Sequence, residues 1–103
     1  MIDWDRAIAL SLTDKKTPIE KALKTAEETG ELAQAVLSVE GAHACGYKNK
    51  TKEDVLEEGV DVILTALSVI AKVYQKFPKE AFLEISTRKL DRWEQKQIRK
   101  RRK

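Results

Sequence analysis

The sequence predicts an all-α fold: a four-helix bundle in one small domain. Three observations predict it. The chain of 103 residues contains only four glycines and two prolines, its apolar residues recur at spacings of three and four, and no segment alternates apolar and polar residues as a half-buried strand does. A chain of this length is too short for two hydrophobic cores. We expect the domain to span residues 1–95 and a basic C-terminal tail to follow at 96–103.

The first two helices are predicted from helix-start signals and apolar spacing. A short helix covers residues 3–12. The second begins after Thr17, because a threonine at the N-cap, Pro18 at the first helical position and Glu20 as the capping-box acid are typical of a helix N-terminus, and it ends before Gly41. Between these limits, apolar and small residues recur at helical spacing: Ile19, Ala22, Leu23, Ala26, Gly30, Ala33 and Leu37.

The third helix is predicted over residues 52–75 and the last over 78–97. Thr51 and Asp54 provide the start signal of the third helix, and Phe77 and Pro78 separate the two. The third helix has two apolar stripes, one of Val55, Gly59, Val62, Ala66, Val69 and Val73, the other of Leu56, Val60, Ile63, Leu67, Ile70 and Tyr74. So wide an apolar surface needs cover on two sides. We therefore expect a second subunit, in a homodimer or homotetramer.

Composition excludes several classes of protein. No run of 18 uncharged apolar residues could span a membrane, and the N-terminus lacks the features of a signal peptide, so we expect a cytoplasmic protein with no membrane partner. Cys45 is the only cysteine and His43 the only histidine. A disulfide within the chain is excluded, and a zinc site is not favoured.

The net charge of +3 is unevenly distributed. Residues 88–103 contain nine basic and two acidic residues, so the rest of the chain is acidic overall. A basic block of this kind can bind nucleic acid, but no nucleic-acid-binding motif accompanies it. A solvated tail is the favoured interpretation, and we expect no nucleic-acid partner.

Two clusters of acids on consecutive helices are the main functional signal. The first contains Glu27, Glu28 and Glu31, and the second contains Glu58 and Asp61. Like charges one helical turn apart repel each other by a few tenths of a kcal/mol, roughly. A solvated charged face is the simplest explanation, but it does not account for a glycine in the middle of each cluster.

Gly30 and Gly59 each cost roughly 1 kcal/mol relative to alanine in a helix interior. We interpret them as points where two antiparallel helices approach closely, because a residue without a Cβ allows a short distance between backbones. This packing brings the two acidic clusters around one cleft.

Several carboxylates around a cleft need cations to neutralise them. Oxygen ligands without imidazole or thiolate favour Mg²⁺, with Mn²⁺ as a possible substitute. Magnesium is commonly bound together with substrate phosphates, and two such ions can activate a water and stabilise both oxygens of an in-line displacement. The expected chemistry is hydrolysis of a phosphoanhydride.

The motifs EExxE (Glu27, Glu28, Glu31) and ExxD (Glu58, Asp61) resemble those of the all-α nucleoside triphosphate pyrophosphohydrolases of the MazG type. The resemblance covers roughly residues 17–93. It implies a four-helix domain that binds Mg²⁺ and cleaves a nucleoside triphosphate between the α and β phosphates. It assigns Glu28, Glu31, Glu58 and Asp61 as metal ligands. Glu27 would complete the metal shell or orient the attacking water, so Glu27 and Glu28 are the candidate catalytic residues.

Basic and aromatic residues are candidates for substrate binding. The resemblance places basic residues on the helix after ExxD, where Lys89 and Arg92 lie. Lys48, in the loop before the third helix, could also approach the phosphates. Ordinary solvated charges are the alternative for all three. Trp4 could stack on a base, although a tryptophan in a small bundle is more often a packing anchor.

Two other functions are compatible with the sequence. Phosphoribosyl-ATP pyrophosphatases share the architecture and the acid-rich helices, but their acids are spaced differently. A non-enzymatic helical module that binds nucleic acid through the basic tail is the second alternative.

Overall fold

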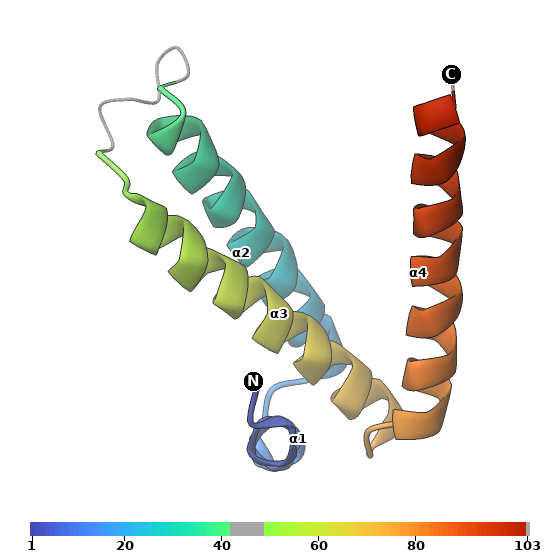
Figure 1. Ribbon diagram of the computed structural model, residues 1–103. Helices are drawn as coiled ribbons and strands as arrows, with labels where there is room; N and C mark the ends of the chain where they lie inside the picture. Colours follow the sequence, from blue (N-terminus) through green and yellow to red (C-terminus); the bar gives the residue numbers. More distant parts are fainter. Residues whose placement is uncertain (42–48, 103) are drawn as a thin grey trace.

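The computed structural model describes residues 1–41 and 49–102 and is entirely helical in its regular elements (Figure 1). The helices are α1 (Trp4–Thr13), α2 (Pro18–Val39), α3 (Lys52–Tyr74) and α4 (Lys79–Arg102). The predicted all-α class is confirmed. Within the described ranges, no helix combines the length and the apolar character needed to cross a membrane.

The predicted capping box at Thr17 is present, and Thr51 and Asp54 form a second one at the predicted start of α3. The hydroxyl of Thr17 accepts a hydrogen bond from the Glu20 backbone N–H at 3.1 Å, and the Glu20 carboxylate accepts one from the Thr17 N–H at 3.0 Å. Thr51 and Asp54 repeat the arrangement at the start of α3, at 3.3 and 2.8 Å. The N–H bond from Thr17 lowers the pKa of Glu20, and that from Thr51 lowers the pKa of Asp54.

The helix ends agree with the sequence at two places and differ at one. Gly41 has a φ of 69°, the left-handed conformation expected beyond a helix C-terminus, and Gln75 ends α3 with a φ of 58°. The predicted end of the last helix near residue 97 is wrong, because α4 continues to Arg102. No glycine or proline interrupts residues 79–102, and basic residues stabilise a helix C-terminus. Residues 96–102 are therefore the end of α4.

α2 and α3 lie side by side and run in opposite directions, as predicted (Figure 1). The core between the helices is small, with only Ala35, Leu67 and Ala71 as buried apolar residues in the described part of the chain. α2 meets α3 through one face, whose members are buried or half-buried: Lys21, Thr25, Glu28, Leu32, Ala35 and Val39.

This face corrects the prediction made from the two glycines. A Cβ added to Gly30 or to Gly59 would meet no atom within 4 Å, so neither residue marks a close approach of backbones within the chain. The apolar residues predicted to form the packing face of α2, from Ile19 to Leu37, are all exposed. The α3-facing side of α2 is instead partly polar, which hydrophobic periodicity does not reveal.

α1 is fixed to the α2–α3 pair by buried polar contacts. The Ser11 and Ser68 hydroxyls are 2.6 Å apart, and the Ser11 hydroxyl also contacts the Ala7 carbonyl at 2.7 Å. Because Ser11 donates to that carbonyl, Ser68 donates to Ser11. Lys21 of α2 forms an ion pair with Asp14 at 2.6 Å, just beyond the end of α1.

α4 stands apart from the other helices (Figure 1). Its first turn contacts α1 through the rings of Trp4, Phe77 and Phe82, whose centroids are 5.2 to 6.3 Å apart, and through an ion pair of Lys79 with Asp5 at 3.2 Å. Beyond that turn, no other described helix packs along α4. One chain therefore does not close a four-helix bundle by itself.

Candidate metal centre

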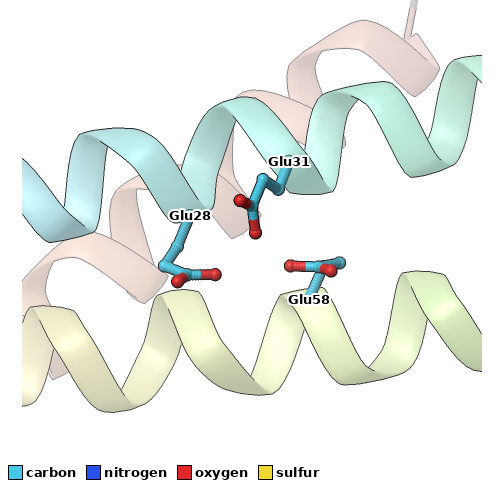
Figure 2. A group of neighbouring side chains, drawn as sticks. All are labelled: Glu28, Glu31 and Glu58. Carbon is cyan, nitrogen blue, oxygen red and sulfur yellow. The ribbon is translucent and has the colours of Figure 1, made fainter.

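Three of the predicted metal ligands converge between α2 and α3. Glu28 and Glu31 come from α2 and Glu58 from α3, and Figure 2 shows their carboxylates directed toward one another. One oxygen from each lies within 4.8 Å of the others. The antiparallel packing of the two helices is what brings together residues nearly thirty positions apart in the sequence.

Glu28 is the most buried member of this group, with 6% of its surface exposed. One of its oxygens, Oε1, lies 3.1 Å from the Lys24 ammonium. The other, Oε2, is buried and has no hydrogen-bond partner, and the same is true of Glu58 Oε2. Buried carboxylate oxygens without a partner are costly, so the cluster as it stands is electrostatically unfavourable.

The pKa of Glu58 reflects this environment. Burial raises it above the ordinary glutamate value, and the neighbouring carboxylate of Glu31 raises it further. Smaller contributions in the same direction come from Glu28 and Asp61. A positive ion among these oxygens would lower the pKa of Glu58 and so oppose these effects.

Lys24 is a member of the site that the sequence analysis missed. The Lys24 ammonium contacts Glu28 at 3.1 Å and Glu27 at 3.4 Å. Both hydrogen bonds raise the pKa of Lys24, and the bond to Glu28 has the larger effect. The first acidic cluster therefore has a cationic partner on its own helix. The signal was present in the sequence, because Lys24 precedes Glu28 by four residues, one helical turn.

The donor set fits a hard divalent cation. The three converging side chains offer only carboxylate oxygens, which are the ligands that Mg²⁺ and Mn²⁺ prefer. The unpartnered oxygens of Glu28 and Glu58 are the two acceptors that such an ion would satisfy. Residues Glu28, Glu31 and Glu58 are thus suited to hold it.

The two remaining acids of the motifs lie at the edge of the cluster. Asp61 is exposed and lies one helical turn from Glu58, where its charge raises the pKa of Glu58. Glu27 is exposed and paired with Lys24. Neither belongs to the group of three converging oxygens in this structure, so their roles as ligand and as catalytic residue stay predictions.

The predicted substrate-binding residues that the structure describes are not assembled around the cluster within one chain. Lys89 and Arg92 are exposed on α4, which packs along neither α2 nor α3. Trp4 contacts Phe77 and Phe82 and is an anchor for the start of α4. Lys48, together with His43 and Cys45, lies outside the described residues.

A cavity lies on a different face of α3. It has a volume of about 690 Å³ and is bordered by α1 and by Leu56, Val60 and Ile63 of α3. Leu56 and Val60 are each two residues from Glu58, about 160° around the helix. The carboxylate cluster and the cavity therefore occupy opposite sides of α3, and none of the predicted site residues in the described part of the chain borders the cavity.

Comparisons of the chain with protein-family models, with curated proteins and with solved structures find no match. The site is therefore interpreted from its own residues and geometry.

Proposed function

We propose that this protein is a Mg²⁺-dependent nucleoside triphosphate pyrophosphohydrolase of the MazG type. The observation that carries the proposal is the convergence of Glu28, Glu31 and Glu58 from two antiparallel helices, with one oxygen of Glu28 and one of Glu58 buried and unpartnered. The EExxE and ExxD motifs that predicted this convergence are the basis of the resemblance. The substrate is a nucleoside triphosphate, and the products are a nucleoside monophosphate and pyrophosphate.

The carboxylates divide into holding and positioning roles. Glu28, Glu31 and Glu58 hold the cation, and Asp61 extends the oxygen set along α3. A divalent ion bound there supplies positive charge that neutralises the phosphate oxygens and makes a water easier to deprotonate. The exposed Glu27 carboxylate is placed one residue from this group, where it accepts a hydrogen bond from the attacking water and orients it.

Lys24 neutralises Glu27 and Glu28 before a substrate arrives. Its ammonium is 44% exposed, so it can leave Glu28 without a large desolvation change. With a cation bound at Glu28, the Lys24 ammonium would be available to contact a phosphate oxygen on the solvent side. Lys89 and Arg92 reach the same edge only from a second copy of the chain, so the active form in this proposal is a homo-oligomer.

The experiment that tests the proposal is a product analysis. The protein is incubated with Mg²⁺ and a panel of canonical and modified nucleoside triphosphates, and monophosphate, pyrophosphate and orthophosphate are quantified. We expect monophosphate and pyrophosphate in equal amounts, and no turnover in EDTA. Orthophosphate with a nucleoside diphosphate would mean that a different bond is cleaved and would refute the mechanism.

A matched pair of variants ties the activity to the cluster. Glu58→Gln is expected to abolish turnover, because it removes one of the three converging carboxylates. Glu57→Gln changes the neighbouring residue, which is exposed and outside the group, and is expected to retain it. Equal loss in both variants would separate the activity from the geometry of the site.

A further inference from the structure

The outer face of α2 is an apolar surface without cover in this chain. We define it as the exposed residues that point away from α3: Ile19, Ala22, Leu23, Ala26, Gly30, Ala33 and Leu37. Ile19 is 74% exposed and Leu23 67%. Apolar residues that recur along five turns of a helix are expected to be buried against another helix.

α4 has a matching unpartnered stripe. Leu83, Leu90 and Trp93 are 67%, 58% and 62% exposed. Together with Ser86 and Gln97, these residues are separated alternately by three and four positions along the helix. This spacing is typical of a helix that packs along the length of another helix. We call these five residues the α4 stripe. The contacts of Trp4 with Phe77 and Phe82 hold the start of α4 in a position from which the stripe does not reach α2 of the same chain.

The two surfaces are complementary in size. The middle of the outer face of α2 consists of Ala26, Gly30 and Ala33, while the middle of the α4 stripe consists of Leu90 and Trp93. The open space next to Gly30, where an added Cβ would meet nothing within 4 Å, provides room for a large side chain from outside the chain. This contact gives the helix-interior glycine a structural reason that packing within one chain does not provide.

The charges beside the two surfaces are complementary as well. At about 100° per residue and viewed from the N-terminus, Glu27 and Glu31 lie clockwise of the outer face of α2. Lys89 and Lys96 lie anticlockwise of the α4 stripe, and Asp91 lies on its clockwise side. When two facing helices run in the same direction, the clockwise side of one meets the anticlockwise side of the other. A parallel arrangement therefore pairs lysines with glutamates, whereas an antiparallel one places Asp91 beside Glu27.

We propose that α4 of a second copy packs parallel to α2, with Leu90 and Trp93 against Ala26, Gly30 and Ala33. In the twofold dimer that we propose, each chain presents both surfaces, so the same contact forms twice and closes the assembly. The basic side of the incoming helix, with Lys89, then lies along the acidic edge of the partner. This interface does not depend on the hydrolase proposal, and its tests measure association rather than turnover.

The first test is sedimentation equilibrium of the full chain and its variants. The unchanged protein is expected to be a dimer. Gly30→Leu and Leu90→Glu are each expected to raise the dissociation constant of the dimer about tenfold or more, because each disrupts the centre of the contact. Glu57→Gln, at an exposed position of α3 outside both surfaces and outside the apolar stripes of α3, serves as the control and is expected to leave it unchanged. Circular dichroism verifies that each variant is folded.

The second test determines whether the two helices run in the same direction and whether they belong to different chains. On a Cys45→Ser background, Leu23→Cys chains are mixed with Ser86→Cys chains and treated with a short bismaleimide. A parallel arrangement with Trp93 beside Gly30 also places Ser86 beside Leu23, so a covalent dimer of one chain of each kind is expected. The same experiment is repeated with Gln97→Cys chains instead of Ser86→Cys chains. If only the Leu23→Cys and Gln97→Cys chains are cross-linked, the contact is antiparallel and the proposal is overturned.

Two further outcomes also overturn it. A monomer at all concentrations would mean that no second copy covers α2. Efficient cross-linking within single Leu23→Cys/Ser86→Cys chains at high dilution would mean that α4 folds back on its own α2. If a dimer forms and its association is insensitive to Gly30→Leu and Leu90→Glu, the contact lies elsewhere, and the assignment of these two surfaces is wrong.

Discussion

Replacing Glu28 by glutamine is expected to have opposite effects on stability with and without Mg²⁺. In the metal-free protein, Glu28 Oε2 is buried and unpartnered, and leaving such a group unsatisfied costs on the order of 1–3 kcal/mol. The glutamine amide has an N–H₂ group that can donate to the neighbouring carboxylates of Glu31 and Glu58, while its oxygen still accepts from Lys24. The pairing with the partly exposed Lys24 is weakened, which costs less because solvent screens this ion pair.

The net change expected for metal-free Glu28→Gln is therefore a gain of about 1 kcal/mol in the free energy of unfolding. For a chain of this size, 1 kcal/mol raises the melting temperature by roughly 4–8 °C. With Mg²⁺ at about 100 times its dissociation constant, the unchanged protein gains about 2.7 kcal/mol. Glu28→Gln has lost a ligand and is expected to gain little, so the order of the two melting temperatures reverses.

The assay is thermal unfolding followed by circular dichroism, in EDTA and across a Mg²⁺ titration, at one fixed protein concentration. Glu27→Gln is the control, because Glu27 pairs with the same lysine but is exposed and outside the converging group. It is expected to change the melting temperature little and to keep the response to Mg²⁺. A Glu28→Gln protein that is less stable in EDTA and is still stabilised by Mg²⁺ would refute the reasoning.

Three other predictions follow from the same structure. Glu31→Gln and Asp61→Asn are each expected to abolish Mg²⁺-dependent pyrophosphate release with an unchanged far-ultraviolet spectrum, and full turnover in both would contradict the assignment. The pKa of Asp14 is lowered from the ordinary value of 3.8 to about 2, mainly by the hydrogen bond from Lys21. The ionised carboxylate therefore stabilises the fold above pH 3.8, and this stabilisation is lost as the pH falls toward 2. Asp14→Asn is expected to flatten the dependence of stability on pH across that window, and a variant curve parallel to the original would argue against the ion pair. Leu67→Ala shortens one of the few buried apolar side chains in the described part of the chain. It is expected to lower the free energy of unfolding by about 2–5 kcal/mol in urea titrations, and a loss below about 1 kcal/mol would show that the core lies elsewhere.

The helix boundaries were predictable because they depend on local chemistry. Thr17 and Thr51 satisfy the first backbone N–H groups of their helices with side chains a few residues away, and Gly41 adopts a conformation that few other residues tolerate. Such signals are contained in short stretches of sequence. The end of α4 was less predictable, because residues 96–102 contain no stop signal and their charge suggested a separate tail.

The buried face of α2 was not predictable from hydrophobic spacing. Periodicity identifies an apolar stripe but not which surface covers it, and on α2 the stripe that includes Leu23 faces outward while Glu28 faces α3. The buried carboxylate carries an energetic cost that sequence patterns do not report. The same polar face is the reason that the acids converge, so the error about the packing face and the success with the cluster have one structural cause.

The candidate site itself was predicted in part. Antiparallel packing was sufficient to bring Glu58 to Glu28 and Glu31, because the spacing of the motifs on two rigid helices determines their meeting point. Lys89 and Arg92 were placed near the cluster by resemblance alone. Their position depends on the direction of α4, which is determined by a ring contact between segments far apart in the sequence and, in our proposal, by a second copy of the chain.

The most direct test of the central claim is a crystal structure with Mn²⁺, located by its anomalous scattering. The account predicts an anomalous peak coordinated by oxygens of Glu28, Glu31 and Glu58, and loss of the peak in Glu58→Gln crystals. Crystals grown in saturating Mn²⁺ that show no peak among these three carboxylates, with the side chains turned apart, would contradict it.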